Sequence, residues 1–110
     1  MWLFTSQGML SVVAHREIPN SLMVRARSPD HITKLFPEAD VKLTVNADYA
    51  YRTVIDRSSF ASFMINYIAE MNYDNFKNSI IEENYRNHCN QVWSTMYRYG
   101  SLNPKSARIE

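Results

Sequence analysis

The chain has 110 residues, of which 45% are hydrophobic and 13% aromatic, enough for one domain that buries a core without staples. Its 12 basic and 11 acidic side chains give a net charge of +1, which argues against a protein that holds nucleic acid by bulk charge. The single cysteine excludes an internal disulfide and indicates a reducing compartment.

The first 27 residues have the patterns of β-strands. A β-rich run over residues 2–5 leads into a turn at Gly8, where positive φ is expected, and residues 9–14 resume the pattern. Residues 22–27 then alternate strictly between two faces. One face carries Leu22, Val24 and Ala26, and the other carries Met23, Arg25 and Arg27. We expect a hairpin or meander with one solvated face.

A short helix separates these strands from two more. Ser28 is predicted to cap it, with Pro29 at its first position. Residues 41–45 alternate between apolar and polar side chains, which indicates a half-buried strand, and residues 49–56 form a further strand rich in Tyr, Thr, Val and Ile.

Helical spacing of apolar side chains begins at Phe60 and continues to Met71. Asp56 or Ser58 can cap this helix, and Asn72 is expected to close it in the left-handed conformation.

The long final helix is predicted over residues 82–99, after a short helical turn within 73–79. Its acidic first turn and Arg98 in its last turn suit the helix dipole. We expect its apolar stripe to be buried. The stripe consists of Tyr85, Cys89, Val92, Trp93, Met96 and Tyr97.

The expected order is therefore β-β-β-α-β-β-α-α. This order indicates an α+β fold, with an antiparallel sheet of four to five strands and helices packed on one face. Residues 1–100 are expected to form a single domain and residues 101–110 a flexible tail.

No pattern of catalytic or cofactor-binding residues is present. The two glycines, Gly8 and Gly100, form no phosphate-binding loop, and the three histidines and Cys89 match no zinc spacing. Cys89 lies on the apolar stripe, so we interpret it as a core residue. We therefore expect no cofactor, no metal and no enzymatic activity.

The solvated face of the sheet is the candidate binding surface. It is predicted to carry Arg25, Arg27 and Lys42. One register of the last strand adds Tyr49, Tyr51 and Thr53 to them, and the other register adds Arg52. Such a face can stay solvated, bind a protein through Arg and Tyr, or stack and neutralise single-stranded nucleic acid. The sequence leaves these three interpretations open.

A second cluster, within residues 73–77, is interpreted in two ways. Tyr73, Asn75 and Lys77 form either a capped connection between helices or part of a binding site.

Several segments together resemble a family of small uncharacterised bacterial and phage proteins. The segments are MWLFT at the start, SVVAHR from Ser11, LMVRAR from Leu22, DYAYR from Asp48, YDNFK from Tyr73 and VWSTMY from Val92. The resemblance implies a compact stand-alone domain and brings no activity or cofactor with it. A small protein of this sort suits a phage-encoded inhibitor of a bacterial defence system, such as an anti-CRISPR protein.

The expected function is therefore that of a non-enzymatic protein-binding module, which can be such an inhibitor. The alternative is RNA or single-stranded nucleic-acid binding, and a homodimer through the open face is also compatible with the sequence. No signal peptide or membrane span is evident, so we expect the cytoplasm, the host's if the protein is phage-encoded. The predicted partner-binding residues are Arg25, Arg27, Lys42, Tyr51, Arg52, Tyr73, Asn75 and Lys77.

Overall fold

The computed structural model describes residues 1–102, and the chain forms two compact units, Met1–Asp74 and Asn75–Glu110. The single domain predicted over residues 1–100 is thus divided between two units. Most of the predicted tail, residues 103–110, lies outside the described residues.

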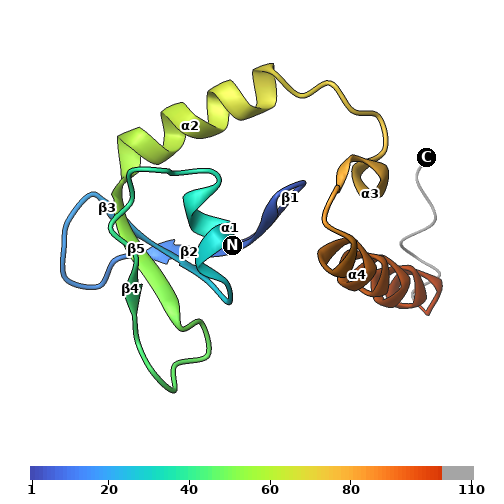
Figure 1. The fold of residues 1–110 in the computed structure, drawn as a ribbon, viewed down its shortest axis with the longest axis horizontal. Helices are drawn as coiled ribbons and strands as arrows, with labels where there is room; N and C mark the ends of the chain where they lie inside the picture. The colour runs from blue at the N-terminus through green and yellow to red at the C-terminus, as the bar shows by residue number, and fades with distance from the viewer. Residues whose placement is uncertain (103–110) are drawn as a thin grey trace. The chain divides into compact units, whose positions relative to one another are not determined.

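The first unit contains a five-stranded antiparallel sheet with the strand order β1-β2-β3-β5-β4 (Figure 1). The predicted α+β class is confirmed. The strand predicted over residues 41–45 is shortened to two residues at the sheet edge, where it pairs with β5 alone. The strands are β1 (Trp2–Thr5), β2 (Gly8–Ala14), β3 (Ser21–Ala26), β4 (Lys42–Leu43) and β5 (Tyr51–Asp56).

Gly8 begins β2 directly after the turn that joins it to β1. Its φ of +152° confirms the predicted positive value, and the ring of His31 lies against its Cα. The Met9 N–H donates to His31 Nδ1 at 3.2 Å, while the Thr5 hydroxyl donates to the Gly8 carbonyl at 2.9 Å. These contacts fix the turn against the segment that begins the first helix.

The first helix, α1 (Pro29–Thr33), is one short turn held by tertiary packing. Pro29 occupies its first turn as predicted, but the expected hydroxyl cap is wrong, because the Ser28 side chain makes no capping hydrogen bond. Ile32 is the buried residue of α1 and has no exposed surface. Burial of this side chain, rather than the cap, therefore anchors α1.

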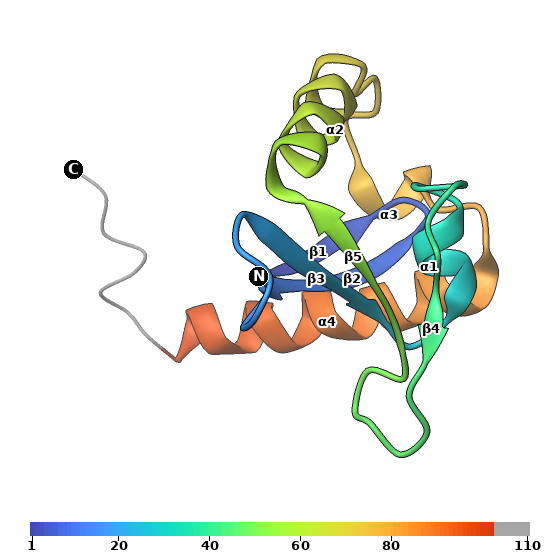
Figure 2. The ribbon, with the colours of Figure 1, turned by 90° about the vertical axis from the view of Figure 1, so that its left-hand side faces the viewer.

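The core of this unit lies on one face of the sheet, under α1 and the start of α2 (Arg57–Ala69). Strand β5 runs directly into α2, as Figure 2 shows. Phe60 enters the core from α2, and Phe63 and Tyr67 extend a row of neighbouring rings along the helix. The core cluster consists of Leu10, Val12, Leu22, Val24, Ala26, Ile32 and Phe60.

Asp56 caps α2, as one of the two predicted candidates. Its carboxylate accepts from the Ser58 and Ser59 N–H groups at 3.1 and 3.3 Å. The predicted end of the helix is wrong: α2 ends at Ala69, and the non-glycine residues with positive φ in the described chain are Asn20 and Asn46, not Asn72. The last turn closes with a tighter bond, from the Met71 N–H to the Ile68 carbonyl at 3.2 Å.

We expect the Asp56 cap to make stability depend on pH in the acid range. Hydrogen bonds from Ser58 and Ser59 hold the pKa of Asp56 below its ordinary value of 3.8. Because the folded-state pKa is the lower one, this contribution is complete above about pH 4 and is lost as the pH falls through the folded value. The melting temperature of the wild type should therefore exceed that of Asp56→Ala at pH 7 by more than at pH 2.5. An equal difference at both pH values would contradict this role.

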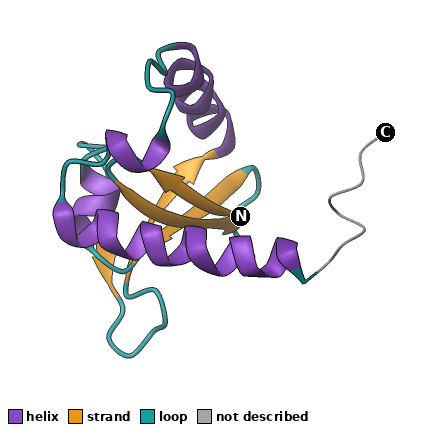
Figure 3. Cartoon of the chain, turned by 90° about the vertical axis from the view of Figure 1, so that its right-hand side faces the viewer, coloured by secondary structure: helices purple, strands orange, loops and turns teal. Residues whose placement is uncertain are grey.

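The second unit contains the short helix α3 (Phe76–Ser79) and the long helix α4 (Glu83–Ser101), both purple in Figure 3. Glu82 caps α4 through the Tyr85 N–H, in keeping with the predicted acidic start. The expected burial of the whole apolar stripe is wrong. Cys89 is buried, but Trp93 is 54% exposed and Tyr97, stacked on it, is 64% exposed.

Candidate binding site on the open face of the sheet

Basic side chains form a row across the sheet on the face opposite the core. In the strand register, Ser11 pairs with Arg25, Arg25 with Arg52, and Arg52 with Lys42. Directly paired residues of antiparallel strands point to the same face. We call these four residues the basic row.

The register also decides between the two candidates that the sequence offered on β5. Arg52 joins the basic row, whereas Tyr51 pairs with Ala26 and packs against the core. Tyr51 therefore lies on the other face from Arg25 and does not contribute to this surface.

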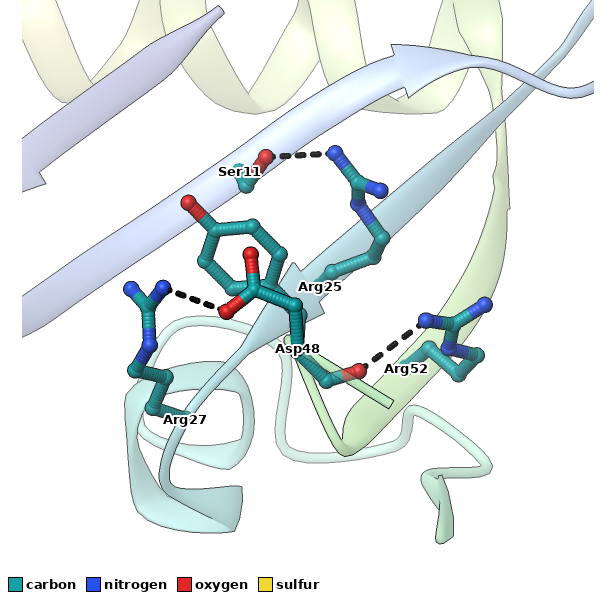
Figure 4. A network of polar contacts seen from close by, with 6 residues as sticks. Ser11, Arg25, Arg27, Asp48 and Arg52 are labelled. Atoms are coloured by element: carbon teal, nitrogen blue, oxygen red, sulfur yellow. Dashed lines mark hydrogen bonds and ion pairs between the residues drawn. The ribbon is translucent and has the colours of Figure 1, made fainter. Parts of the chain in front are cut away.

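Arg25 is held at two points (Figure 4). Its Nη2 donates to the Ser11 hydroxyl at 2.6 Å, and its guanidinium carbon lies 4.9 Å from the centroid of the Tyr49 ring. Its Nε is buried and has no hydrogen-bond partner. The guanidinium is thus fixed in place with donors still unused.

Arg52 is also held by Tyr49, through its backbone carbonyl rather than its ring. Its Nη2 donates to the Tyr49 carbonyl at 3.0 Å, and its Nε is also buried without a partner. In the described part of the chain, neither Arg25 nor Arg52 forms an ion pair. Two like charges face each other across β3 and β5, an arrangement that lowers sheet stability.

The cations on either side of this pair are already matched by carboxylates. Arg27 Nη2 lies 2.8 Å from Asp48 Oδ1, and this hydrogen bond raises the pKa of Arg27. Lys42 Nζ lies 3.0 Å from Asp40 Oδ2 at the sheet edge. Among Arg25, Arg27, Lys42 and Arg52, the cations without an ion pair in the described residues are therefore Arg25 and Arg52.

The sequence offered Tyr49 for this face only in the register that also placed Tyr51 there, and it did not indicate Ser11. Tyr49 is only 7% exposed, and the guanidinium groups of Arg25 and Arg27 lie over its ring. It precedes β5 in a loop, where strand alternation does not set the direction of a side chain. Ser11 is a small polar residue in a β-rich run and gives no signal of its own.

The second predicted cluster is divided between the two units. The Asn75 side chain accepts from the Asn78 N–H at 3.0 Å, so it caps α3, and Lys77 Nζ lies 4.1 Å from the Trp93 ring centroid. Both belong to the second unit. Tyr73 closes the first unit, and burial raises its pKa, with a smaller contribution from Tyr67. The capping interpretation thus holds for Asn75.

Two further candidates from the sequence, the Cys89 thiol and the His15 ring, are held by burial or by local hydrogen bonds. Burial raises the pKa of the Cys89 thiol, which disfavours the nucleophilic thiolate, and His15 Nδ1 accepts from the Glu17 and Ile18 N–H groups at 3.0 Å. Within residues 1–102, no three His, Cys, Asp or Glu side chains are placed to hold a metal ion. No helix in the same residues has the length and apolar character needed to cross a membrane.

Fold and site together define an α+β protein whose antiparallel sheet carries a basic row on its open face. Searches of protein-family models, of curated proteins and of solved structures find no match to this chain. Its function is therefore argued from the site.

Proposed function

We propose that the protein is a non-enzymatic protein-binding module that contacts its partner through the basic row. The observation that carries the proposal is the opposed pair Arg25 and Arg52. Both are fixed by hydrogen bonds, and neither is matched by a carboxylate within the described residues. Two uncompensated like charges on paired residues lower the stability of the free protein. A partner that neutralises them would recover this free energy on binding, which is a physical reason for their presence.

An apolar row beside the basic row supports a protein partner. Two residues along each strand from the basic row, the same face carries a second set of paired residues, Val13, Met23 and Val54. Both valines are exposed. Trp2 pairs with Ser11 and extends the basic row with an exposed indole. Arginine beside aromatic and aliphatic side chains is typical of the centre of protein interfaces.

A module of this kind can act as an inhibitor simply by occupying the surface of its partner. The anti-CRISPR-like role that suits a small stand-alone phage protein is one instance of this proposal, because such an inhibitor needs no catalytic group of its own.

Binding of single-stranded nucleic acid remains the second candidate function, and the site supports it less well. Such binding uses exposed aromatic rings as stacking platforms along a charged groove. Tyr49 is buried beneath arginines, and Tyr51 packs against the core. Trp2 is the exposed ring of the basic row.

A tagged pull-down from lysate of a candidate host, with and without nuclease, tests the proposal. The variant Arg25→Ala/Arg52→Ala should lose the captured protein, because it removes both uncompensated charges. The control Arg57→Ala/Arg98→Ala removes the same net charge elsewhere and should retain it. Far-UV circular dichroism checks that both variants fold.

Two results would overturn the proposal. One is capture that is equally strong in the Arg25→Ala/Arg52→Ala variant, which would remove the basic row as the contact surface. The other is loss of every captured protein on nuclease treatment, which would favour the nucleic-acid function.

A further inference from the structure

We infer that Arg25 and Arg52 together bind one carboxylate, the side chain of an Asp or Glu residue presented by the protein partner. The inference rests on the proposed function and specifies the chemistry of the partner at this site. It names the group that would match the charge left uncompensated in the basic row.

The strand register places the two arginines next to each other on this face. Directly opposed residues of antiparallel strands have Cβ atoms about 4.5–5.5 Å apart, so Arg25 and Arg52 arise side by side on one face. Each guanidinium uses Nη2 for an internal bond, to Ser11 or to Tyr49, and retains further donors. A carboxylate has two oxygens and can accept from both groups.

One residue positions both members of the pair. The Tyr49 ring lies beside the guanidinium of Arg25, and the Tyr49 carbonyl accepts from Arg52. Two long side chains are thus ordered before any ligand arrives, which reduces the entropy lost on binding. In Figure 4, Arg25 and Arg52 extend from neighbouring strands.

The distribution of charge favours a single carboxylate over a polyanion. Asp48 matches Arg27, and Asp40 matches Lys42, with both carboxylates largely exposed. A nucleic-acid strand would bring its successive phosphates past these two carboxylates and be repelled. One acidic side chain needs only the two central arginines.

The pair has a further consequence for the free protein. Because two like charges oppose each other, replacing one of them by a neutral donor relieves repulsion in the absence of a partner. We therefore expect Arg52→Gln to leave the melting temperature unchanged or to raise it, while weakening carboxylate binding by about tenfold to a hundredfold.

Nuclear magnetic resonance of the full chain, observing the arginine Nε–H groups, tests the inference directly. A short peptide with one central Glu should shift the Arg25 and Arg52 signals saturably and leave the Arg27 signal in place. The same peptide with Gln should produce no such shift, and Arg25→Gln or Arg52→Gln should raise the peptide concentration that saturates the other arginine by about tenfold to a hundredfold. An oligothymidylate should bind no better than the Glu peptide.

Other outcomes would overturn the inference. They are an absent response to the Glu peptide, an equal response to the Gln peptide, or a stronger response to the oligothymidylate. These failures are distinct from failure of the proposed function. If Arg25→Ala/Arg52→Ala still loses its captured protein, the basic row remains the contact surface and only the carboxylate ligand is wrong.

Discussion

Replacement of Gly8 by alanine is expected to lower the free energy of unfolding by about 2–5 kcal/mol. The φ of +152° at this position is strained for any L side chain. An added Cβ would also lie 2.4 Å from His31 Cγ, so the ring must move. That movement breaks the bond from the Met9 N–H and displaces the helix that holds Ile32 in the core. Urea denaturation of the purified variant measures the loss.

Gly100→Ala is the matched control for this prediction. Gly100 lies in the last turns of α4, and no atom would approach a Cβ there within 4 Å. Alanine is the better helix former by about 0.5–1 kcal/mol, so this variant should be as stable as the wild type or more stable. A loss below about 0.5 kcal/mol for Gly8→Ala would contradict the argument, since surface substitutions without such constraints have effects of that size.

Truncation of Ile32 to alanine is expected to cost about 2–5 kcal/mol, the range for large-to-small changes in a packed core. Ile32 has no exposed surface and contributes the buried residue of α1. A helix of five residues is not stable alone, so the docking of α1 on the sheet depends on this side chain. The expected result is a lower denaturation midpoint with little change in its urea dependence.

Ile65→Ala provides the comparison for Ile32. It removes the same atoms from α2, but Ile65 is 67% exposed. Its removal therefore exposes little buried surface and leaves no cavity, and we expect the free energy of unfolding to change by less than about 0.5 kcal/mol. Equal losses in the two variants would show that α1 is not anchored through the core as described.

The local patterns of the sequence predict most of the first unit. Strict alternation over residues 22–27 places Val24 and Ala26 in the core and Arg25 on the opposite face, as found. Asp56, one of two candidates from the sequence, proves to be the cap of α2, and positive φ at Gly8 follows from residue type. Each of these features depends on neighbours in the chain, which the sequence displays directly.

The candidate site depends on the pairing of distant segments. Residues 49–56 alternate in either register, and a shift of one residue exchanges Tyr51 for Arg52 on the open face. Tyr49 and Asp48 lie in a loop, where no periodicity fixes their direction, yet they bind three arginines. The sequence therefore indicates that basic residues lie on the open face, but it does not determine which of them are neighbours.

The apolar stripe of α4 marks the limit of the same reasoning. Helical periodicity correctly predicts the helix and the burial of Cys89, but it does not reveal that Trp93 and Tyr97 are exposed. The sequence by itself determined most of the helices and strands, the alternation along β3 and the positive φ at Gly8. Only the tertiary structure decided the β5 register, the matching of Arg27 and Lys42 by carboxylates, and the isolation of Arg25 and Arg52. Elements arise from contacts between near neighbours, whereas these three features require residues far apart in the chain to meet.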